Sequence, residues 1–265
     1  MSAQSSADFD ITPCAEALRR GDPDRFLAVM AAPAPARPLL FAVYAAALEI
    51  ARAPWVTKEP MIAEMRLQWW HDALEEIAAQ GIPRRHEIVT PLAAVLPPEA
   101  AQHFQIAIKA RQWDIYKEAH ADEAALLAYI EATSGAPIWA AMLALGAPQE
   151  AFKPAMAIAR AGGLIRYFAA LPALEEAGCI PLVDGRAEGI KDLASKAWSD
   201  FRGAKNLRRT VGPVISAPLL EAAMNAAALP AVIRAPMRVA HGAVGLSEAR
   251  KRWRLMRLAG AKSWR

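Results

Sequence analysis

The side chains of this sequence that could do chemistry are arginines, glutamates and a tyrosine at scattered positions. A guanidinium presents a fork of donors that fits a phosphate group, and a carboxylate can hold a divalent cation. We assign no catalytic, cofactor-binding or metal-binding residue. The candidates for contact with a cavity or a bound anion are Glu49, Arg52, Arg66, Tyr129 and Arg166.

Structural roles compete with each of these candidates. Glu49 and Arg52 are three residues apart and could form a surface ion pair worth under about 0.5 kcal/mol. Buried ion pairs with other helices are the simpler role for Arg66 and for Asp72. A structural pair, a solvated face or helix packing would likewise explain the remaining members of this set: Arg37, Arg160, Arg166 and Tyr129.

The histidines and cysteines indicate neither a metal site nor a nucleophile. The 5 histidines lack the i, i+4 pairing or the carboxylate grouping that is typical of metal ligands. Cys14 and Cys179 are far apart, which argues against a disulfide framework and fits a reducing compartment. No serine lies in a nucleophile-elbow motif.

The segment 250–265 is basic, contains no acid and has Trp253 and Trp264 interleaved with arginines. It could be a solvated helix end, an interfacial membrane helix or a nucleic-acid contact. The interleaved Trp and Arg residues favour an interfacial helix over a nucleic-acid contact, and a solvated helix end is an equal alternative. We expect no nucleic-acid partner. The candidates for membrane contact are Arg252, Trp253, Arg254, Arg257 and Trp264.

The elements that must position these residues are predicted to be helices. The 265 residues are 55% hydrophobic, alanine supplies much of that fraction, and long β-branched runs are almost absent. Residues 1–10 do not resemble a secretory signal, and no uninterrupted apolar run approaches the roughly 18 residues of a membrane span. We therefore expect a cytoplasmic protein that at most contacts a membrane from outside.

Caps, prolines and glycines divide the chain into successive helices. Thr12-Pro13 and Asp22-Pro23 mark two starts, and Gly162-Gly163 indicates a kink or a very close helix contact. We expect Trp69 and Trp70 to pack mainly in the core. No repeat or linker divides the chain, so residues 1–265 are predicted to form one all-α domain of antiparallel helices. The further helices are expected at 38–52, 59–80, 98–120, 122–145, 148–171, 190–209, 217–228, 230–241 and 247–258, with a loop-rich segment at 172–189.

Three stretches, in this order, resemble the squalene/phytoene synthase family. They are Asp24-Arg25-Phe26 with 37–45 (RPLLFAVYA), 129–135 (YIEATSG) followed by Leu145-Gly146, and 161–166 (AGGLIR). The resemblance implies the all-α isoprenoid (terpenoid) synthase fold, a single antiparallel helical bundle.

The family ionises an allylic diphosphate with Mg²⁺ that is held by two Asp-x-x-x-Asp motifs on facing helices. The positions matching those acids here are Ala51, Trp55, Ala170 and Leu174, and Ala132 replaces a functional tyrosine. Without the carboxylates, the charge of the metal–diphosphate group would be uncompensated in a low-dielectric cavity. The resemblance thus implies a retained fold with lost or altered chemistry and no cofactor. Mg²⁺ is expected only if catalysis survives.

The segment 64–74 (EMRLQWWHDAL) resembles a divergent branch of the family. That branch includes the assembly factors of mitochondrial respiratory complex I and their bacterial relatives. The resemblance implies a role at the inner face of the inner membrane. The partner would be a membrane protein complex or an isoprenoid or lipid-like ligand.

Two alternatives stay open beside this non-catalytic interpretation. An active head-to-head prenyltransferase, which would make squalene- or phytoene-type products from isoprenyl diphosphates, could take its acids from Glu49 together with Glu175 or Glu176. A binding module unrelated to either function would have an interior filled by side chains.

Overall fold

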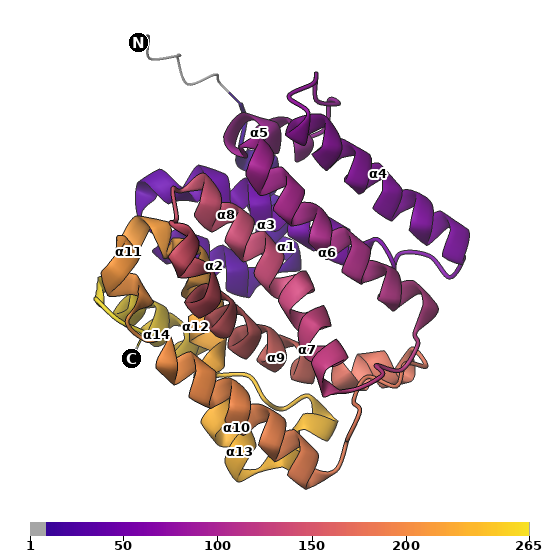
Figure 1. The fold of residues 1–265 in the computed structure, drawn as a ribbon, viewed down its shortest axis with the longest axis vertical. Helices are drawn as coiled ribbons and strands as arrows, with labels where there is room; N and C mark the ends of the chain where they lie inside the picture. The colour runs from indigo at the N-terminus through magenta and orange to yellow at the C-terminus, as the bar shows by residue number, and fades with distance from the viewer. Residues whose placement is uncertain (1–8, 265) are drawn as a thin grey trace.

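A computed structural model describes residues 9–264, and in that range the chain forms helices, turns and loops without a β-strand (Figure 1). The predicted all-α class is confirmed. The expectation about a secretory signal falls mainly on residues 1–8, which lie outside the described residues. The α-helices are α1 (Thr12–Gly21), α2 (Pro23–Ala31), α3 (Arg37–Arg52), α4 (Pro60–Ala78), α5 (Val89–Val95), α6 (Pro98–Tyr116), α7 (Glu123–Ile130), α8 (Ala136–Ala144), α9 (Phe152–Glu176), α10 (Ala187–Gly203), α11 (Leu207–Ile215), α12 (Leu220–Ala226), α13 (Leu229–Arg234) and α14 (Glu248–Gly260).

Several helix starts follow directly from local sequence. The Asp22 carboxylate accepts a hydrogen bond from the backbone N–H of Arg25 at 3.1 Å and caps α2. Asp122 caps α7 in the same way through Ala125, at 2.8 Å. The helix start predicted at Asp22-Pro23 is therefore confirmed, and the helix expected from residue 122 begins with Asp122 as its cap.

Other boundaries differ from the prediction. Helix α6 ends at Tyr116 because Lys117 adopts a left-handed conformation with φ 57°, four residues before the expected end. The expected helix 122–145 is interrupted by a π-helical turn at Glu131–Gly135 between α7 and α8. Helices α5 and α11 were not expected. α11 is broken at Gly212, where φ is 84°.

Helix α9 is longer than expected and runs through Pro172 to Glu176, so the loop begins later than predicted. The predicted close contact at the adjacent glycines is confirmed. A Cβ built on Gly162 would lie 2.5 Å from the carbonyl oxygen of Ala222, and one on Gly163 would lie 2.7 Å from the Ser134 hydroxyl. Only glycine lets α12 and the π-helical turn approach α9 this closely.

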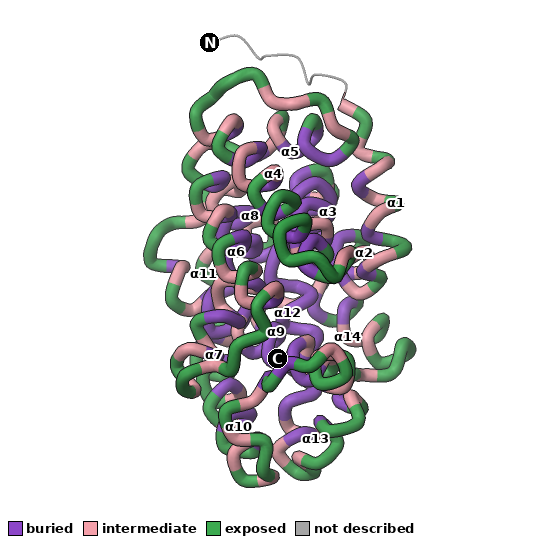
Figure 2. Tube along the Cα trace, turned by 90° about the vertical axis from the view of Figure 1, so that its right-hand side faces the viewer, coloured by how far each residue is buried: buried purple, intermediate pink, exposed green. Residues whose placement is uncertain are grey.

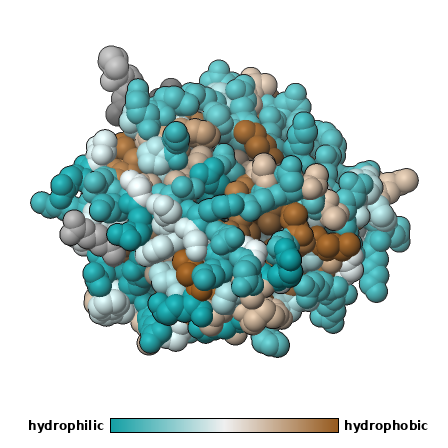
Figure 3. All heavy atoms as spheres, turned by 60° about the horizontal axis from the view of Figure 1, so that its bottom comes forward, coloured by the Kyte–Doolittle hydropathy of each residue, from teal (hydrophilic) through white to brown (hydrophobic). Residues whose placement is uncertain are grey.

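The core is centred on α3, α9 and α12: every residue of α12 is buried, as are most of α3 and about half of α9 (Figure 2). Helix α9 packs against α12, α10 and α7, and α4 lies beside α6 at one edge of the molecule (Figure 1). Helices α10 and α13 form the opposite end. On the face of Figure 3, apolar atoms form small separate groups among hydrophilic ones.

Two helical segments are long and apolar enough to span a membrane, by length and composition alone. These are Ala34–Arg52 and Glu123–Ala144, and 67% of each apolar window is buried inside the structure. A third would be the bent pair Leu207–Ile215 and Ala217–Arg234 if it were one span. These segments do not contradict the absence of an uninterrupted apolar run in the sequence, because each of them also contains polar residues. Their burial shows that the two straight segments supply core surface in this fold.

Candidate functional site

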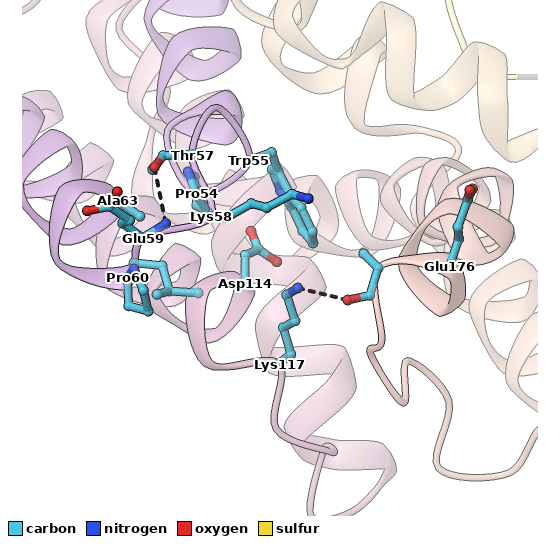
Figure 4. A pocket seen from close by; sticks show the side chains of 12 residues that line it. Pro54, Trp55, Thr57, Lys58, Glu59, Pro60, Ala63, Asp114, Lys117 and Glu176 are labelled. Carbon is cyan, nitrogen blue, oxygen red and sulfur yellow. Dashed lines mark hydrogen bonds between the residues drawn. The ribbon is translucent and has the colours of Figure 1, made fainter.

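A cavity of about 470 Å³ lies where four helix ends meet (Figure 4). It is bounded by the chain after α3, the start of α4, and the ends of α6 and α9. The volume is within the range of small-molecule sites. Its lining consists of Pro54, Trp55, Thr57, Lys58, Glu59, Pro60, Ala63, Asp114, Ile115, Lys117, Glu176 and Ala177.

Both regions that would carry the metal-binding acids reach this cavity. Trp55, at one of the four positions, lines the cavity and is 39% exposed. The end of α9 lines the other side through Glu176 and Ala177, two and three residues after Leu174. The cavity therefore contains an indole where the resemblance expects a carboxylate.

The charges around the cavity are mixed. Lys117 donates from Nζ to the carbonyl oxygen of Ala177 at 2.7 Å and so connects the end of α6 to the end of α9 (Figure 4). Lys58, Glu59 and Glu176 also line the cavity. A Mg²⁺-diphosphate cluster needs several converging carboxylates. Asp114 also lines the cavity but contacts Arg111 and Tyr129, and Glu59 and Glu176 lie on opposite sides of it (Figure 4), so this donor set does not fit such a cluster.

The acids considered for an active enzyme do not converge. Glu49 lines a second cavity, between α3 and α4, and its Oε1 lies 3.2 Å from Nη1 of Arg52. Glu176 lines the first cavity, and Glu175 is exposed at the end of α9. Glu49 and Glu176 therefore belong to different sites.

Asp114 is the one deeply buried acid at the first cavity, with 1% of its surface exposed. The hydroxyl of Tyr129 donates to it at 2.6 Å, and Arg111 contacts it at 2.9 Å. Arg111 also donates to the Tyr129 oxygen at 2.9 Å. Burial, and secondarily the Asp114 charge, raise the pKa of Tyr129 well above its usual value despite the opposing Arg111, so its proton is retained.

A second buried network contains the predicted candidate Arg166. Its guanidinium contacts Asp22 at 2.8 Å and Glu221 at 3.1 Å, and Asn225 donates to the same Glu221 oxygen. Burial alone would raise the pKa of Asp22, but the charges of Arg166 and Arg25 outweigh it and lower the pKa to about 2. Arg166 is therefore already neutralised by two carboxylates.

The two networks are balanced in charge. Three arginines face three carboxylates, and each arginine lies beside an acid: Arg25, Arg111 and Arg166 with Asp22, Asp114 and Glu221. An incoming anion would have to compete with a carboxylate for every one of these guanidinium groups. Arg111, Asp114 and Glu221 were not predicted as site residues. The pairing of Arg111 with Asp114 is a local i, i+3 contact, but the contacts of Asp114 with Tyr129 and of Glu221 with Arg166 join residues 15 and 55 positions apart.

An aromatic enclosure adjoins the first network. His120, in the loop after α6, stacks on Trp113 with ring centres 4.3 Å apart and lies beside Tyr129 and Tyr167. Burial lowers the pKa of His120 despite the nearby Asp114 charge, so the ring is neutral at pH 7. The Tyr167 hydroxyl donates to the carbonyl oxygen of Pro181 at 2.7 Å. These rings fill space between α6, α7 and α9.

The other residues predicted to contact a cavity or an anion lie outside the two buried networks. Arg66, with Glu49, lines the second cavity, and Arg52 forms the expected surface pair with Glu49. The predicted buried ion pair of Arg66 is wrong: Arg66 is exposed and has no ion pair within residues 9–264. Asp72 is half-exposed and accepts from Gln68 at 2.7 Å, so its predicted buried pair is wrong as well.

The structural readings of several other side chains are confirmed. Arg160 pairs with Glu131 at 2.7 Å, and Arg37 donates to the carbonyl oxygen of Ala32. Trp70 is buried in the core, whereas Trp69 is only partly buried and also lines the second cavity.

One grouping on α4 departs from the expectation for the histidines. Ligand atoms of His71, Asp72 and Glu75 lie within 4.8 Å of one another. These positions are i, i+1 and i+4 of one helix, and all three side chains are half-exposed or exposed. The grouping lies on α4 away from the 470 Å³ cavity.

The C-terminal membrane candidates divide into two groups. Arg252, Trp253 and Arg257 are exposed on α14, and the Arg257 guanidinium lies 4.7 Å from the Trp253 ring centre. Trp264 is 1% exposed and lies under Arg208, so it belongs to the core and cannot contact a membrane. Arg254 is half-buried and directs its guanidinium to the carbonyl oxygen of Ala223. The structure thus corrects the membrane face by removing Trp264 from it.

Comparisons with known proteins fit this architecture. The family model for squalene/phytoene synthase matches residues 18–182. A dehydrosqualene synthase, solved in complex with ligand, superposes with a TM-score of 0.71 at 14% identity, covering 94% of each chain. Squalene synthase HpnC from Alicyclobacillus acidocaldarius superposes with a TM-score of 0.67 at 15% identity, covering 89% of this chain and 95% of that one. No curated protein matches the sequence.

Proposed function

Because this chain belongs to the squalene/phytoene synthase family and has the isoprenoid synthase fold, we propose that it is a member that keeps the fold without the diphosphate-ionising chemistry. The observation that carries this proposal is Trp55 in the 470 Å³ cavity, among lysines and separated acids, where a metal-binding carboxylate is expected. Mg²⁺ and other cofactors are not part of the proposed function.

The charges in this interior do not suit ionisation of a diphosphate. Ionising an allylic diphosphate releases a highly charged leaving group, which needs several positive charges in a site of low dielectric constant. Here the half-buried arginines are already paired with acids, and the cavity lysines number two. Neither set supplies what a metal cluster would supply.

For the retained role we propose assistance to a membrane protein complex of the respiratory complex I type, or binding of an isoprenoid or lipid-like ligand. The likeness of residues 64–74 to the assembly-factor branch supports the first. The size of the 470 Å³ cavity supports the second. We place the protein at the cytoplasmic face of the inner membrane, in contact through Arg252, Trp253 and Arg257 of α14.

The deciding experiment incubates the purified chain with Mg²⁺ and C15 or C20 isoprenyl diphosphates (C counts carbons), with product analysis and calorimetry in parallel. An active dehydrosqualene synthase serves as the positive control. We expect no product and no Mg²⁺-dependent binding heat. A squalene- or phytoene-type product would refute the proposal and establish an active prenyltransferase.

A further inference from the structure

The 470 Å³ cavity contains charged side chains that no other part of the described chain neutralises. Lys58, Glu59, Lys117 and Glu176 all line it, and all four are exposed. Among residues 9–264 none of the four takes part in an ion pair. The Lys117 ammonium contacts only a carbonyl oxygen, that of Ala177. Two ammonium groups and two carboxylates are therefore available to a ligand.

The third acid of this cavity, Asp114, is not available in the same way. Its carboxylate lies 2.9 Å from the Arg111 guanidinium and accepts from the Tyr129 hydroxyl at 2.6 Å. Its charge is therefore already compensated. The charges that remain at the cavity are two positive and two negative, and their sum is zero.

The available charges of opposite sign are also separated in space. Figure 4 shows Glu59 on one side of the cavity and Glu176 on the other, with Lys58 and Lys117 between them. Lys58 and Glu59 precede α4, whereas Lys117 and Glu176 belong to the ends of α6 and α9. A small molecule that extends from the lysines toward either acid therefore meets both signs of charge.

This arrangement discriminates between classes of ligand by charge. An apolar chain would remove all four groups from water without compensating them. An anion alone would pair with the lysines but would place its charge near two carboxylates, and a cation alone would meet the lysines in the same way. A molecule with one group of each sign compensates both kinds of side chain. The cavity is therefore complementary to a zwitterion.

Trp55 adds a surface for the positive end of such a molecule. Its side chain lines the cavity and is 39% exposed, so part of the indole is open to a ligand. The face of an indole attracts an ammonium group, and a lysine ammonium is a common partner of phosphate. These two preferences fit a ligand whose cation is an ammonium and whose anion is a phosphate.

We propose that the cavity binds a molecule in which a short linker joins an ammonium group to a phosphate, as in phosphoethanolamine. The phosphate lies between Lys58 and Lys117, and the ammonium contacts Trp55 and one of the flanking carboxylates, Glu59 or Glu176. The source is a free phosphoethanolamine compound or the head group of phosphatidylethanolamine. The inference rests on the proposed function, because a cavity that still ionised a diphosphate would select anions.

The test is isothermal titration calorimetry of the whole protein, without Mg²⁺, with O-phosphoethanolamine, inorganic phosphate and ethanolamine. Phosphoethanolamine should bind about tenfold or more tightly than phosphate or ethanolamine, because its two linked contacts act together. Inorganic diphosphate is the competing anion and should bind less tightly than phosphoethanolamine.

Variants locate the two charges. Glu59→Gln with Glu176→Gln should reduce the affinity for phosphoethanolamine to that for phosphate and should not weaken phosphate binding. Lys58→Gln should weaken both ligands about threefold or more, since it removes a phosphate contact. Glu118→Gln changes an exposed acid next to Lys117 that does not line the cavity, and it should alter neither affinity. Circular dichroism confirms that each variant is folded.

A further ligand distinguishes the two sources of the head group. Dihexanoyl phosphatidylethanolamine, used below its micelle concentration, carries the same head group on two short acyl chains. Binding about tenfold or more tighter than that of free phosphoethanolamine would identify a lipid, because the chains then bury apolar surface as well. Equal affinity would identify a free compound.

Two results would overturn the inference. One is that phosphoethanolamine binds no more tightly than phosphate, and the other is that Glu59→Gln with Glu176→Gln leaves its preference unchanged. If the protein also makes no product from isoprenyl diphosphates, either result refutes the zwitterion site and leaves the proposed function standing. Tighter binding of inorganic diphosphate than of phosphoethanolamine, together with a prenyl product, would refute both.

Discussion

Charged side chains of the two buried networks form ion pairs with one another, and Arg166 is the clearest example. It contacts two carboxylates that are themselves only 5% and 3% exposed, Asp22 and Glu221. Removing one partner of such a group leaves buried charge without compensation, which costs far more than the intact pair contributes. The residue therefore contributes to stability, and an anion binding its 35% exposed side chain would compete with both carboxylates.

Arg166→Met should accordingly lower the free energy of unfolding by about 2–4 kcal/mol, because buried Glu221 loses its ion-pair partner and buried Asp22 keeps only Arg25. Urea unfolding followed by circular dichroism measures the change. Arg160→Met is the matched control on the same helix, since its pairs with Glu131 and Asp200 are half-exposed, and it should cost about 1 kcal/mol or less. Equal costs for the two variants would contradict the buried network.

The same network predicts a specific acid dependence. The pKa of Asp22 is about 2 in the folded protein and about 3.9 in an unfolded chain. A lowered pKa stabilises the fold above the unfolded value, and this contribution is lost as the pH falls from about 4 to about 2. Asp22→Asn keeps a residue that can cap α2 but removes the titrating group.

Wild type should therefore lose about 2 kcal/mol more than Asp22→Asn over that pH range. The measurement is urea unfolding at a series of pH values. Parallel pH profiles for the two proteins would show that Asp22 is not the titrating group.

For individual residues, the sequence predicts only roles that depend on neighbouring positions, such as helix capping. The Asp22-Pro23 pair indicated a helix cap, and the structure has one. The second role of Asp22, as a partner of Arg166, depends on a contact between residues 144 positions apart. The contact of Asp114 with Tyr129 could not be predicted for the same reason. Tyr129 lies on the next helix, and the intervening turn is determined by the fold.

At the scale of elements, helix ends were predictable where proline or a capping side chain sets them. They were not predictable where a rarer backbone state intervenes, as at Lys117 in the left-handed region or in the π-helical turn at Glu131–Gly135. Pro172 illustrates the opposite error. It suggests a break, yet α9 continues through it, since tertiary packing offsets the loss of one backbone hydrogen bond.

Helix spacing gives the sharpest prediction at this scale. Gly162→Ala places a methyl group against the backbone of α12, which cannot move aside as a flexible side chain could, so we expect a loss of about 3 kcal/mol or more. Gly203→Ala on α10 meets no atom within 4 Å and should be neutral or stabilising by up to about 1 kcal/mol. Thermal unfolding of both variants tests the contrast. A mild Gly162→Ala phenotype would mean that α9 and α12 are further apart than described.

At the scale of the molecule, the predicted fold and family agree with the structure better than the predicted site residues do. The family resemblance and the helical class are confirmed by the family match and the two superposed synthases. The candidate site is only partly recovered. Tyr129 and Arg166 belong to the interior, whereas Glu49 and Arg66 line a separate groove and Arg52 pairs with Glu49 on the surface. Helical periodicity predicts which residues are helical but not which helices become neighbours.

The exposed face of α14 predicts how the whole protein behaves with lipid. Vesicles containing phosphatidylserine should cosediment more protein than vesicles of phosphatidylcholine alone, because the exposed arginines beside Trp253 favour an anionic interface. Trp253→Ser with Arg257→Ser should reduce binding about threefold or more. Met237→Ser on another surface should not. Undiminished binding by the α14 variant would rule out this face.

The Arg166 contacts also have a consequence for the order of folding. Asp22 belongs to the start of the chain and Glu221 to its last fifth, so the network around Arg166 is complete only when both ends have reached α9. Closing so long a loop costs entropy before the contact repays it, and chains dominated by distant contacts fold slowly. We therefore expect both ends to join late, in one cooperative step. A fragment that lacks the C-terminal end would leave Arg25 and Arg166 facing Asp22 alone, with one positive charge uncompensated in the core.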